Sequence, residues 1–290
     1  MTIWNLGSIN ADMVYSLPHL PGPGETLAAS DLKQFLGGKG ANMSVAAARA
    51  GSHVSHIGAV GTDGAWAVER LLEFGVDTRH IATVDTPTGH AIVAVDDQGE
   101  NQIILFPGAN RAVPQDQLGL ALSQASAGDI LVMQNETCLQ ADAAKMGRDL
   151  GLRVCYAAAP FDADAVQAVL PFLDFLILNE IEAEQLRQAV GKSPQALGIK
   201  DVVITLGAKG ARYFDGEIGD MRDVPALPVT PVDTTGAGDT FTGYVLSGLD
   251  RGLPMPQAMA QAARAGALMV TRHGTADVIP DLKEVQDSTF

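Results

Sequence analysis

Aromatic residues and cysteines are scarce in this sequence, and acidic residues outnumber basic ones. Aromatic side chains make up 5% of the 290 residues, which gives little reason to expect a site that stacks nucleobases. Lys and Arg number 19 against 34 Asp and Glu, so the formal net charge is −15. That charge argues against nucleic acid or an anionic membrane as a partner. A nucleotide remains compatible, because backbone N–H groups and a metal ion can hold phosphates.

Long apolar runs and an export signal are also missing. No apolar run reaches the roughly 18–20 residues of a membrane span. The start, Met1–Asn5, lacks the basic and apolar regions of a signal peptide. Cys138 and Cys155 do not have the spacing of metal ligands. We therefore expect a cytoplasmic protein without a membrane segment, in which the cysteines are buried thiols rather than a disulfide.

Apolar residues are nevertheless abundant, at 47%, and the length allows one large α/β domain or two smaller ones. Short apolar runs typical of buried strands alternate with segments of helical periodicity. This pattern predicts βα units around a mostly parallel sheet that helices cover on both faces. The expected strands are 3–7, 54–60, 130–133, 154–156, 175–178 and 202–205, and the expected helices are 40–49, 65–74, 141–150, 164–170, 180–190 and 241–249.

Two stretches depart from this alternation. Residues 13–36 contain three prolines and have no helical period, whereas residues 91–106 alternate apolar and polar side chains around the turn Asp96–Gly99. The second pattern predicts a β-hairpin. We expect both stretches to form a small antiparallel sheet beside the α/β body. It would act either as a lid over a ligand or as a simple edge extension.

The most informative local pattern is the glycine-rich turn that ends at Asp239. Gly236, Ala237 and Gly238 expose several backbone N–H groups at the positive end of a helix dipole, which suits an anion. A carboxylate at position 239 would repel a bound anion. It can, however, accept a proton from a hydroxyl while the N–H groups hold a phosphoryl group in transfer. Taken alone, the turn is also compatible with an ordinary helix start.

Two segments earlier in the chain have the residues expected of a sugar site. Asn10 and Asp12 follow the first expected strand, at the edge where open α/β sheets bind ligands, and can clamp neighbouring hydroxyls. Residues 37–42 read Gly-Gly-Lys-Gly-Ala-Asn. The glycines let the backbone approach a ligand, and Lys39 and Asn42 add a positive charge and an amide. Either segment alone could instead be a structural turn.

Three segments after later strands extend the expected site. Glu136 follows one strand and can reach a sugar. Asn179 and Glu182 follow another, and Glu182 can order the water shell of a phosphate-bound Mg²⁺. Acidic residues also suit the first turn of a helix, which is the structural alternative. The small residues of Thr205–Gly210 either let a nucleotide lie against the backbone or form a hairpin turn.

Together these segments resemble the ribokinase-like sugar kinases, also called the phosphofructokinase-B family. The resemblance runs in order along nearly the whole chain, and it is closest to the ribokinase branch in Gly7–Asp12 and Pro107–Asn110. It implies a single three-layer α/β domain over residues 1–290, with a mostly parallel sheet flanked by helices. It also implies a small antiparallel β lid formed by approximately residues 11–37 and 88–108. The matching segments are 7–12, 37–42, 61–64, 107–110, 179–182, 205–210, 233–239 and 271–274.

The resemblance also assigns roles position by position. It implies that Asp239 is the catalytic base and that Gly236, Ala237 and Gly238 form the anion hole. The sugar-facing residues it implies are Asn10, Asp12, Gly38, Lys39, Asn42, Glu136 and Asp239. ATP would be contacted by Asn179, Thr205, Gly207 and Gly210, with Mg²⁺ held through water by Glu182. A monovalent cation, K⁺, is implied at Asp233 and Thr235 and at the backbone carbonyls of Met269, Arg272, Gly274 and Val278.

The sequence departs from the family pattern at several positions, among them Arg264, to which we assign no role, and the end of the chain soon after Pro280, without a long terminal helix. Ala157–Pro160 stands where members often have Asn-Pro-Ala-Pro, which bears on whether ribose is the substrate. The region 188–200 is short, as though a helix had been trimmed.

Because family members often pair their lids, which protects the sheet edges, we expect a homodimer through the lid.

The expected reaction is ATP-dependent phosphorylation of a primary hydroxyl on a small sugar, O5 of D-ribose. Alternatives within the family are kinases for deoxyribose, fructose, a keto-deoxy sugar acid or a nucleoside. A non-catalytic sugar-binding protein is an alternative of a different class, but it would need neither Asp239 nor Glu182. A dehydrogenase is disfavoured because the chain lacks G-x-G-x-x-G after its first strand.

Overall fold

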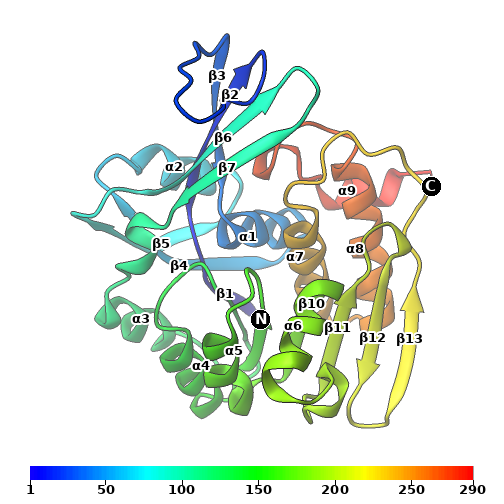
Figure 1. Ribbon diagram of the computed structural model, residues 1–290. Helices are drawn as coiled ribbons and strands as arrows, with labels where there is room; N and C mark the ends of the chain where they lie inside the picture. Colours follow the sequence, from blue (N-terminus) through cyan, green and yellow to red (C-terminus); the bar gives the residue numbers. More distant parts are fainter. Residues whose placement is uncertain (290) are drawn as a thin grey trace.

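The computed structural model describes residues 1–289 and contains a large and a small β-sheet (Figure 1). In the large sheet, every neighbouring pair from β11 to β5 is parallel, and β12 and β13 add an antiparallel edge. In spatial order its strands are β13 (Asp220–Val224), β12 (Ala211–Asp215), β11 (Asp201–Thr205), β10 (Phe175–Asn179), β9 (Arg153–Ala157), β8 (Ile130–Gln134), β1 (Thr2–Leu6), β4 (His53–Gly61) and β5 (Asp77–Val84).

Helices cover both faces of the large sheet and create two cores (Figure 1). Successive strand residues point to opposite faces, so Ile3 packs in one core and Trp4 in the other. The first core contains residues of α1, α2, α7, α8 and α9, and the second contains residues of α3 to α6. The expected three-layer α/β architecture is therefore confirmed. The helices are α1 (Lys39–Arg49), α2 (Ala65–Glu73), α3 (Gln115–Leu122), α4 (Gln140–Asp149), α5 (Ala163–Val169), α6 (Glu180–Val190), α7 (Ala237–Asp250), α8 (Met255–Met269) and α9 (Leu282–Asp287).

The small sheet projects from the body where β1 ends, because β2 follows β1 after only three residues (Figure 1). The predicted hairpin is the pair β6–β7, and its turn closes with a 3.0 Å bond from Gly99 N–H to Asp96 O. Both outer pairs are antiparallel, as expected, but the central pair β2–β6 is parallel. The strand order is β3 (Asp31–Gly37), β2 (Asn10–Leu17), β6 (Gly89–Asp96) and β7 (Asn101–Phe106).

Three strands at the edges of the large sheet were not predicted from the sequence. They are the two edge strands β5 and β13, and β12 beside β13; the residues of β5 and β12 are mostly half-buried, and those of β13 are mostly exposed. Edge strands need no continuous apolar run, so the pattern that identified the central strands is absent from them. The β11–β12 connection passes through a short 3₁₀ turn at Gly207–Lys209 and joins antiparallel strands. This confirms the hairpin interpretation of Thr205–Gly210.

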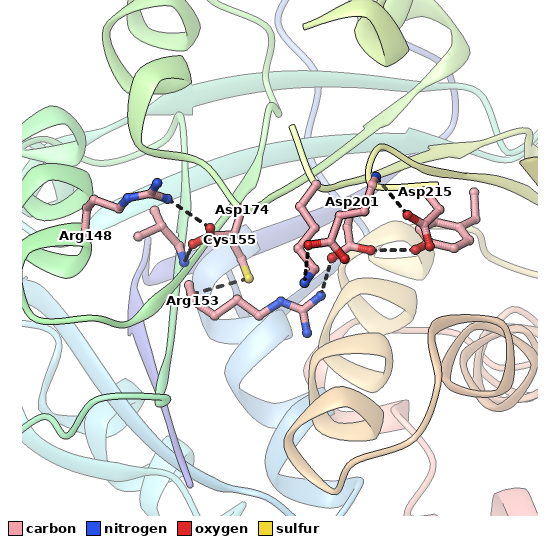
Figure 2. Close-up of polar contacts among 10 residues, drawn as sticks. Arg148, Arg153, Cys155, Asp174, Asp201 and Asp215 are labelled. Carbon is pink, nitrogen blue, oxygen red and sulfur yellow. Dashed lines mark hydrogen bonds and ion pairs between the residues drawn. The ribbon is translucent and has the colours of Figure 1, made fainter. Parts of the chain in front are cut away.

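Ion pairs lie at the N-terminal ends of β9, β10 and β11 in the large sheet (Figure 2). Arg153 at the start of β9 lies 2.6 Å from the carboxylate of Asp201 at the start of β11. The hydroxyl of Tyr213 donates to the same carboxylate at 2.6 Å. Arg148 pairs at 3.0 Å with Asp174, which precedes β10. These charges lie at the N-terminal edge of the sheet. Ligands bind in this class of fold at the opposite edge, where the strands have their C-terminal ends.

Both cysteines are free thiols, as expected, although only Cys155 is buried and Cys138 is half-buried. Burial raises the pKa of the Cys155 thiol to about 12, so this thiol stays protonated and unreactive. Within residues 1–289, no helix combines the length and the apolar character needed to cross a bilayer.

Candidate functional site

A cavity of about 150 Å³ opens at the C-terminal ends of the central strands, beside the start of α7. Residues of the large sheet, α1 and α7 line it together. Seven of the thirteen lining residues belong to the set predicted from sequence, so the structure brings together segments that are far apart in the chain. The lining residues are Lys39, Met43, Ala157, Ala159, Ile177, Leu178, Asn179, Glu182, Thr205, Gly236, Gly238, Asp239 and Thr242.

The turn before α7 depends on glycine at position 236. Gly236 is the N-cap of α7 and has φ 75°, in the left-handed region that favours glycine. An added Cβ would lie 3.1 Å from Met269 Cε and 3.3 Å from Asn42 Nδ2. The turn therefore has neither the backbone freedom nor the space for a larger residue at this position.

The backbone amides of this turn differ in whether they are free to bind a ligand. The N–H of Ala237 is donated to Thr234 O at 3.2 Å. The N–H groups of Gly236, Gly238 and Asp239 have no hydrogen-bond partner among residues 1–289. An anion hole was expected from Gly236, Ala237 and Gly238. In the structure the Ala237 N–H already has a hydrogen-bond acceptor, whereas the Asp239 N–H is free. Three free amides at a helix N-terminus form a suitable cradle for an anion.

Asp239 lies in the floor of the cavity and is held by Asn42. The Asn42 amide donates from Nδ2 to Asp239 Oδ2 at 3.0 Å. Burial raises the pKa of Asp239 to about 6, and the positive charge of Lys39 and the bond from Asn42 act in the opposite direction. Asn42 Oδ1 is buried and has no protein partner in the described part of the chain. This oxygen can accept a hydrogen bond from a hydroxyl placed beside Asp239.

A second carboxylate, Glu136, supports the loop that contains Lys39. Its Oε2 accepts hydrogen bonds from Ser8 Oγ at 2.5 Å and from the Lys39 backbone N–H at 3.1 Å. Asp12 lies nearby, and burial, together with the charges of Glu136 and Asp239, raises the pKa of Asp12 to about 7. Lys39 is the cation of this region, and its pKa is raised chiefly by Asp239, with smaller effects of Glu136 and Glu182. Polar groups of both signs are therefore concentrated where a polyhydroxylated ligand would lie.

Asn110 is a residue of this region to which sequence reasoning assigned no role. Its Nδ2 donates to Asn10 Oδ1 at 2.7 Å and to Ile9 O at 3.2 Å, while its Oδ1 accepts from Ile9 N–H at 2.9 Å. Because the Asn10 oxygen is thus occupied, the Asn10 amide is oriented with its NH₂ group free for a ligand. The only sequence signal was the position of Asn110 in the segment Pro107–Asn110.

The nucleotide-facing residues predicted from sequence fall into two groups. Asn179 and Glu182 line the cavity and form a capping box at the start of α6, with reciprocal backbone bonds of 2.8 Å. Thr205 also lines the cavity, whereas Gly207 and Gly210 do not. Both glycines have positive φ, at 57° and 105°, and serve the β11–β12 turn. Residues 179–182 therefore form a helix start and residues 205–210 a hairpin turn, as the structural alternatives proposed. Asn179, Glu182 and Thr205 also line the cavity.

The residues expected to bind a monovalent cation lie in two segments that Asp233 links. Its carboxylate accepts the backbone N–H of Thr235 at 2.9 Å and that of Gly274 at 3.2 Å. Two of the expected carbonyls already have donors, both from Arg272: its N–H to Met269 O at 3.0 Å, and its Nη1 to Val278 O at 3.3 Å. Among residues 1–289, no group of three or more His, Cys, Asp and Glu side chains is arranged to hold a metal.

Comparison with known proteins identifies the class to which this fold and site belong. The model of the pfkB family of carbohydrate kinases matches residues 3–282. The chain is 36% identical to a ribokinase of Haemophilus influenzae over 98% of this chain and 96% of the relative. It is 30% identical to a deoxyribokinase of Salmonella typhi over 99% of this chain and 98% of the relative. The Arabidopsis thaliana ribokinase structure with ribose and ATP superposes with a TM-score of 0.85 at 30% identity, covering 98% of this chain and 97% of that one.

The chain therefore belongs to the pfkB family of carbohydrate kinases. It is an ATP-dependent sugar kinase, as the sequence motifs predicted.

The raised pKa of Asp239 predicts an acid limit to activity. A carboxylate with a folded pKa of about 6 loses its charge as the pH falls through that value, so kcat/KM for the sugar should decline below about pH 6. Lys39 holds this pKa down, so Lys39→Met should move the midpoint of the decline to higher pH. The measurement is kcat/KM against pH for wild type, Lys39→Met and the exposed control Lys192→Met. An unchanged midpoint in Lys39→Met would contradict the assignment.

Proposed function

We propose that this kinase transfers the γ-phosphoryl group of ATP to O5 of D-ribose. The observation that carries the proposal is the 3.0 Å bond from Asn42 to Asp239, beside three free amides at the start of α7. The names of the relatives support ribose as substrate, since those of Haemophilus influenzae and Arabidopsis thaliana are ribokinases. Deoxyribose is the second candidate, because the Salmonella typhi relative is a deoxyribokinase.

Asp239 acts as the general base in the proposed mechanism. Its Oδ1 is not engaged by Asn42, and it accepts the proton of the sugar hydroxyl as that oxygen attacks the γ-phosphorus. The O–H bond and the bond from the phosphorus to the bridging oxygen of ADP break, and the new O–P bond forms. A pKa of about 6 suits a base at neutral pH, because the group is ionised yet still basic.

The free amides of Gly236, Gly238 and Asp239 hold the phosphoryl group while it is transferred. They are fixed by the helix and need no rearrangement, so they stabilise charge on the equatorial oxygens as it develops. Lys39 lies beside the same cavity and adds a positive charge. The small sheet contributes by closing over the sugar, which excludes water that would otherwise compete as acceptor. We assign the lid to residues 11–37 and 88–108.

Mg²⁺ fits the side of the cavity formed by Glu182. One oxygen of this carboxylate accepts the Asn179 N–H, and the other has no protein partner within residues 1–289. Burial raises the pKa of Glu182, and the Asn179 N–H and the charge of Lys39 offset this rise only in part, so a cation nearby would stabilise the charged form. Through water, Glu182 and Asn179 would hold a Mg²⁺ bound to ATP, and the ion would supply neutralisation of the phosphate charge.

A monovalent cation fits beside Asp233, because this carboxylate has no ion-pair partner in the part of the chain that is described. Arg272, the nearby basic residue, pairs instead with Glu284 at 2.9 Å. A K⁺ ion held by Asp233, the Thr235 region and the carbonyls of Met269, Arg272, Gly274 and Val278 would supply the missing positive charge. Its binding would fix the turn that presents the amides of α7.

A homodimer through the lid is supported by the apolar surface of β7. Every residue of this edge strand is exposed, and Ile103 and Ile104 are 57% and 61% exposed. An exposed, apolar edge strand is a liability in a monomer, and a second copy of the same sheet would cover it.

Asp239→Asn tests the catalytic base. The variant preserves size and the polar contact but cannot accept the proton, so kcat should fall by roughly 10²–10⁴. Stability should be unchanged or higher, because burial of the charged carboxylate is unfavourable in the wild type. Steady-state rates, sugar affinity by calorimetry and Tm give the answer. Turnover close to that of wild type would remove Asp239 from the mechanism.

A substrate panel tests the identity of the sugar. With ATP and Mg²⁺, kcat/KM should be highest for D-ribose and lower for deoxyribose, fructose, a keto-deoxy sugar acid and a nucleoside. A missing hydroxyl leaves a buried polar group of the site unpaired. K⁺ should raise the rate relative to a large organic cation. Tight sugar binding without any ATP turnover would instead indicate a non-catalytic binding protein.

The double variant Ile103→Asp/Ile104→Asp tests the dimer. Charges on both faces of β7 should raise the concentration at which dimers dissociate by at least about tenfold, since a buried unpaired charge costs more than 1.4 kcal/mol. The matched control is Leu120→Asp/Leu72→Asp, whose side chains are 57% and 62% exposed on α3 and α2. Light scattering coupled to size exclusion gives the mass. A monomeric wild type, or equal effects of both double variants, would contradict the lid interface.

A further inference from the structure

A group of four buried polar side chains lies beneath the sugar-facing loops and takes no part in the mechanism above. They are Asn5, Ser44, His56 and Gln134, and none is more than 1% exposed. They come from β1, α1, β4 and β8, respectively. Polar groups at such positions are costly in a core unless their hydrogen bonds are made, and apolar residues of similar size could fill the same space. Their hydrogen bonds therefore indicate what they hold.

Above this group, the backbones of Gly7 and Gly40 are in direct contact. A Cβ added to Gly40 would lie 2.3 Å from Gly7 Cα, which no side chain can accommodate. The two loops of the proposed sugar site diverge from this crossing. One continues from Gly7 to Asn10, and the other contains Lys39 immediately before Gly40. Any relative movement of the two glycines would change the separation of the sugar-facing side chains.

Asn5 and His56 each bind the carbonyl of one of these two glycines. Asn5 Nδ2 donates one hydrogen to Gly40 O and the other to Ser44 Oγ, both at 2.8 Å. His56 Nε2 lies 3.0 Å from Gly7 O, and its Nδ1 lies 2.8 Å from Ser44 Oγ.

The direction of every bond in this group follows from the groups available. A carbonyl can only accept, so the His56 proton must be on Nε2, and Nδ1 must accept the Ser44 hydroxyl proton. The ring is neutral, because burial lowers the pKa of His56 to about 4. Gln134 Nε2 donates to Asn5 Oδ1 at 2.9 Å and fixes the orientation of that amide. The group thus forms one connected path between the carbonyls of Gly7 and Gly40.

We propose that Asn5 and His56 are positioning residues that hold the two sugar-facing loops at a fixed separation by binding the carbonyls of Gly7 and Gly40. The proposal rests on the assignment of these loops to the sugar in the proposed function. It predicts a defect in sugar KM, because within residues 1–289 none of the hydrogen bonds of this network reaches the amides at α7 or the nucleotide-facing residues.

Two substitutions of His56 separate the contact with Gly7 from the rest of the network. The amide nitrogen of Gln occupies the position of Nε2, so His56→Gln can still donate to Gly7 O. The amide oxygen of Asn occupies the position of Nδ1, so His56→Asn keeps the contact with Ser44 and loses that with Gly7. We expect His56→Asn to raise sugar KM by roughly three- to tenfold, the range of one lost hydrogen bond. We expect His56→Gln to stay within about twofold of wild type, and kcat and ATP KM to change little in both.

Ser247→Ala serves as the control for a general loss of stability. Ser247 is fully buried and bonds to Ser52 at 2.9 Å, far along α7 from Asp239. This variant should lower Tm without changing sugar KM. If His56→Asn does not fold, His56→Phe fills the same space, also lacks the donor to Gly7, and should show the same increase in sugar KM.

The outcomes distinguish this inference from the proposed function. The inference would be overturned if the sugar KM of His56→Asn, or of His56→Phe, equalled that of His56→Gln while Tm was lowered. That result would show a purely structural network. Failure of the proposed function would appear in wild type as absence of ribose turnover. The comparison would then use the sugar of the panel with the highest kcat/KM, and the same ordering of variants would still be required.

Discussion

The site depends on one hydrogen bond, between Asn42 Nδ2 and Asp239 Oδ2, which joins residues 197 positions apart. It can form because α1 and α7 pack closely, and Gly243 makes this possible: a Cβ there would lie 2.6 Å from both Ala46 Cβ and Met43 O. The bond places the sugar-facing helix start and the anion-binding helix start in one cavity. In the proposed mechanism, this arrangement brings the sugar hydroxyl, the base and the amides that hold the phosphoryl group within reach of one another.

Electrostatics explain why the cavity can be both acidic and catalytic. Burial raises the pKa values of Asp12, Glu182 and Asp239, while Lys39 acts against this for Asp239 and Glu182. An excess of carboxylates around one lysine leaves the site short of positive charge. A kinase that uses cations as well as protein side chains can tolerate that shortage, because the ions arrive with the nucleotide or bind beside it. The acidic composition of the chain is thus consistent with binding a polyphosphate through amides and ions.

The sequence predicted the central strands, six helices (α1, α2, α4, α5, α6 and α7) and the glycine-rich turn before α7, because these depend on local patterns. It did not predict α3, α8 and α9. The edge strands β5 and β13, and β12 beside β13, were missed because partly exposed residues do not form apolar runs. Predicted site residues line the cavity where a motif fixes the backbone, as at Gly236 and Lys39. The sequence did not predict contacts between residues that only the folded chain brings together. Asn110, which orients Asn10 across 100 residues, is of this kind, and so is the occupied amide of Ala237.

The buried network under the sugar loops shows the same limit more strongly. In sequence, Asn5 interrupts an apolar strand and His56 another, and each could be read as a weak point in that strand. The strand register explains why both residues are polar: β1 and β4 are parallel neighbours, and Asn5 lies opposite His56. Both residues lie next to the contact between Gly7 and Gly40, and their donors reach Gly40 O and Gly7 O, respectively. The role of a polar residue in a predicted core strand is therefore found from the groups that the neighbouring strand places beside it. Here those groups fix the two loops of the proposed sugar site.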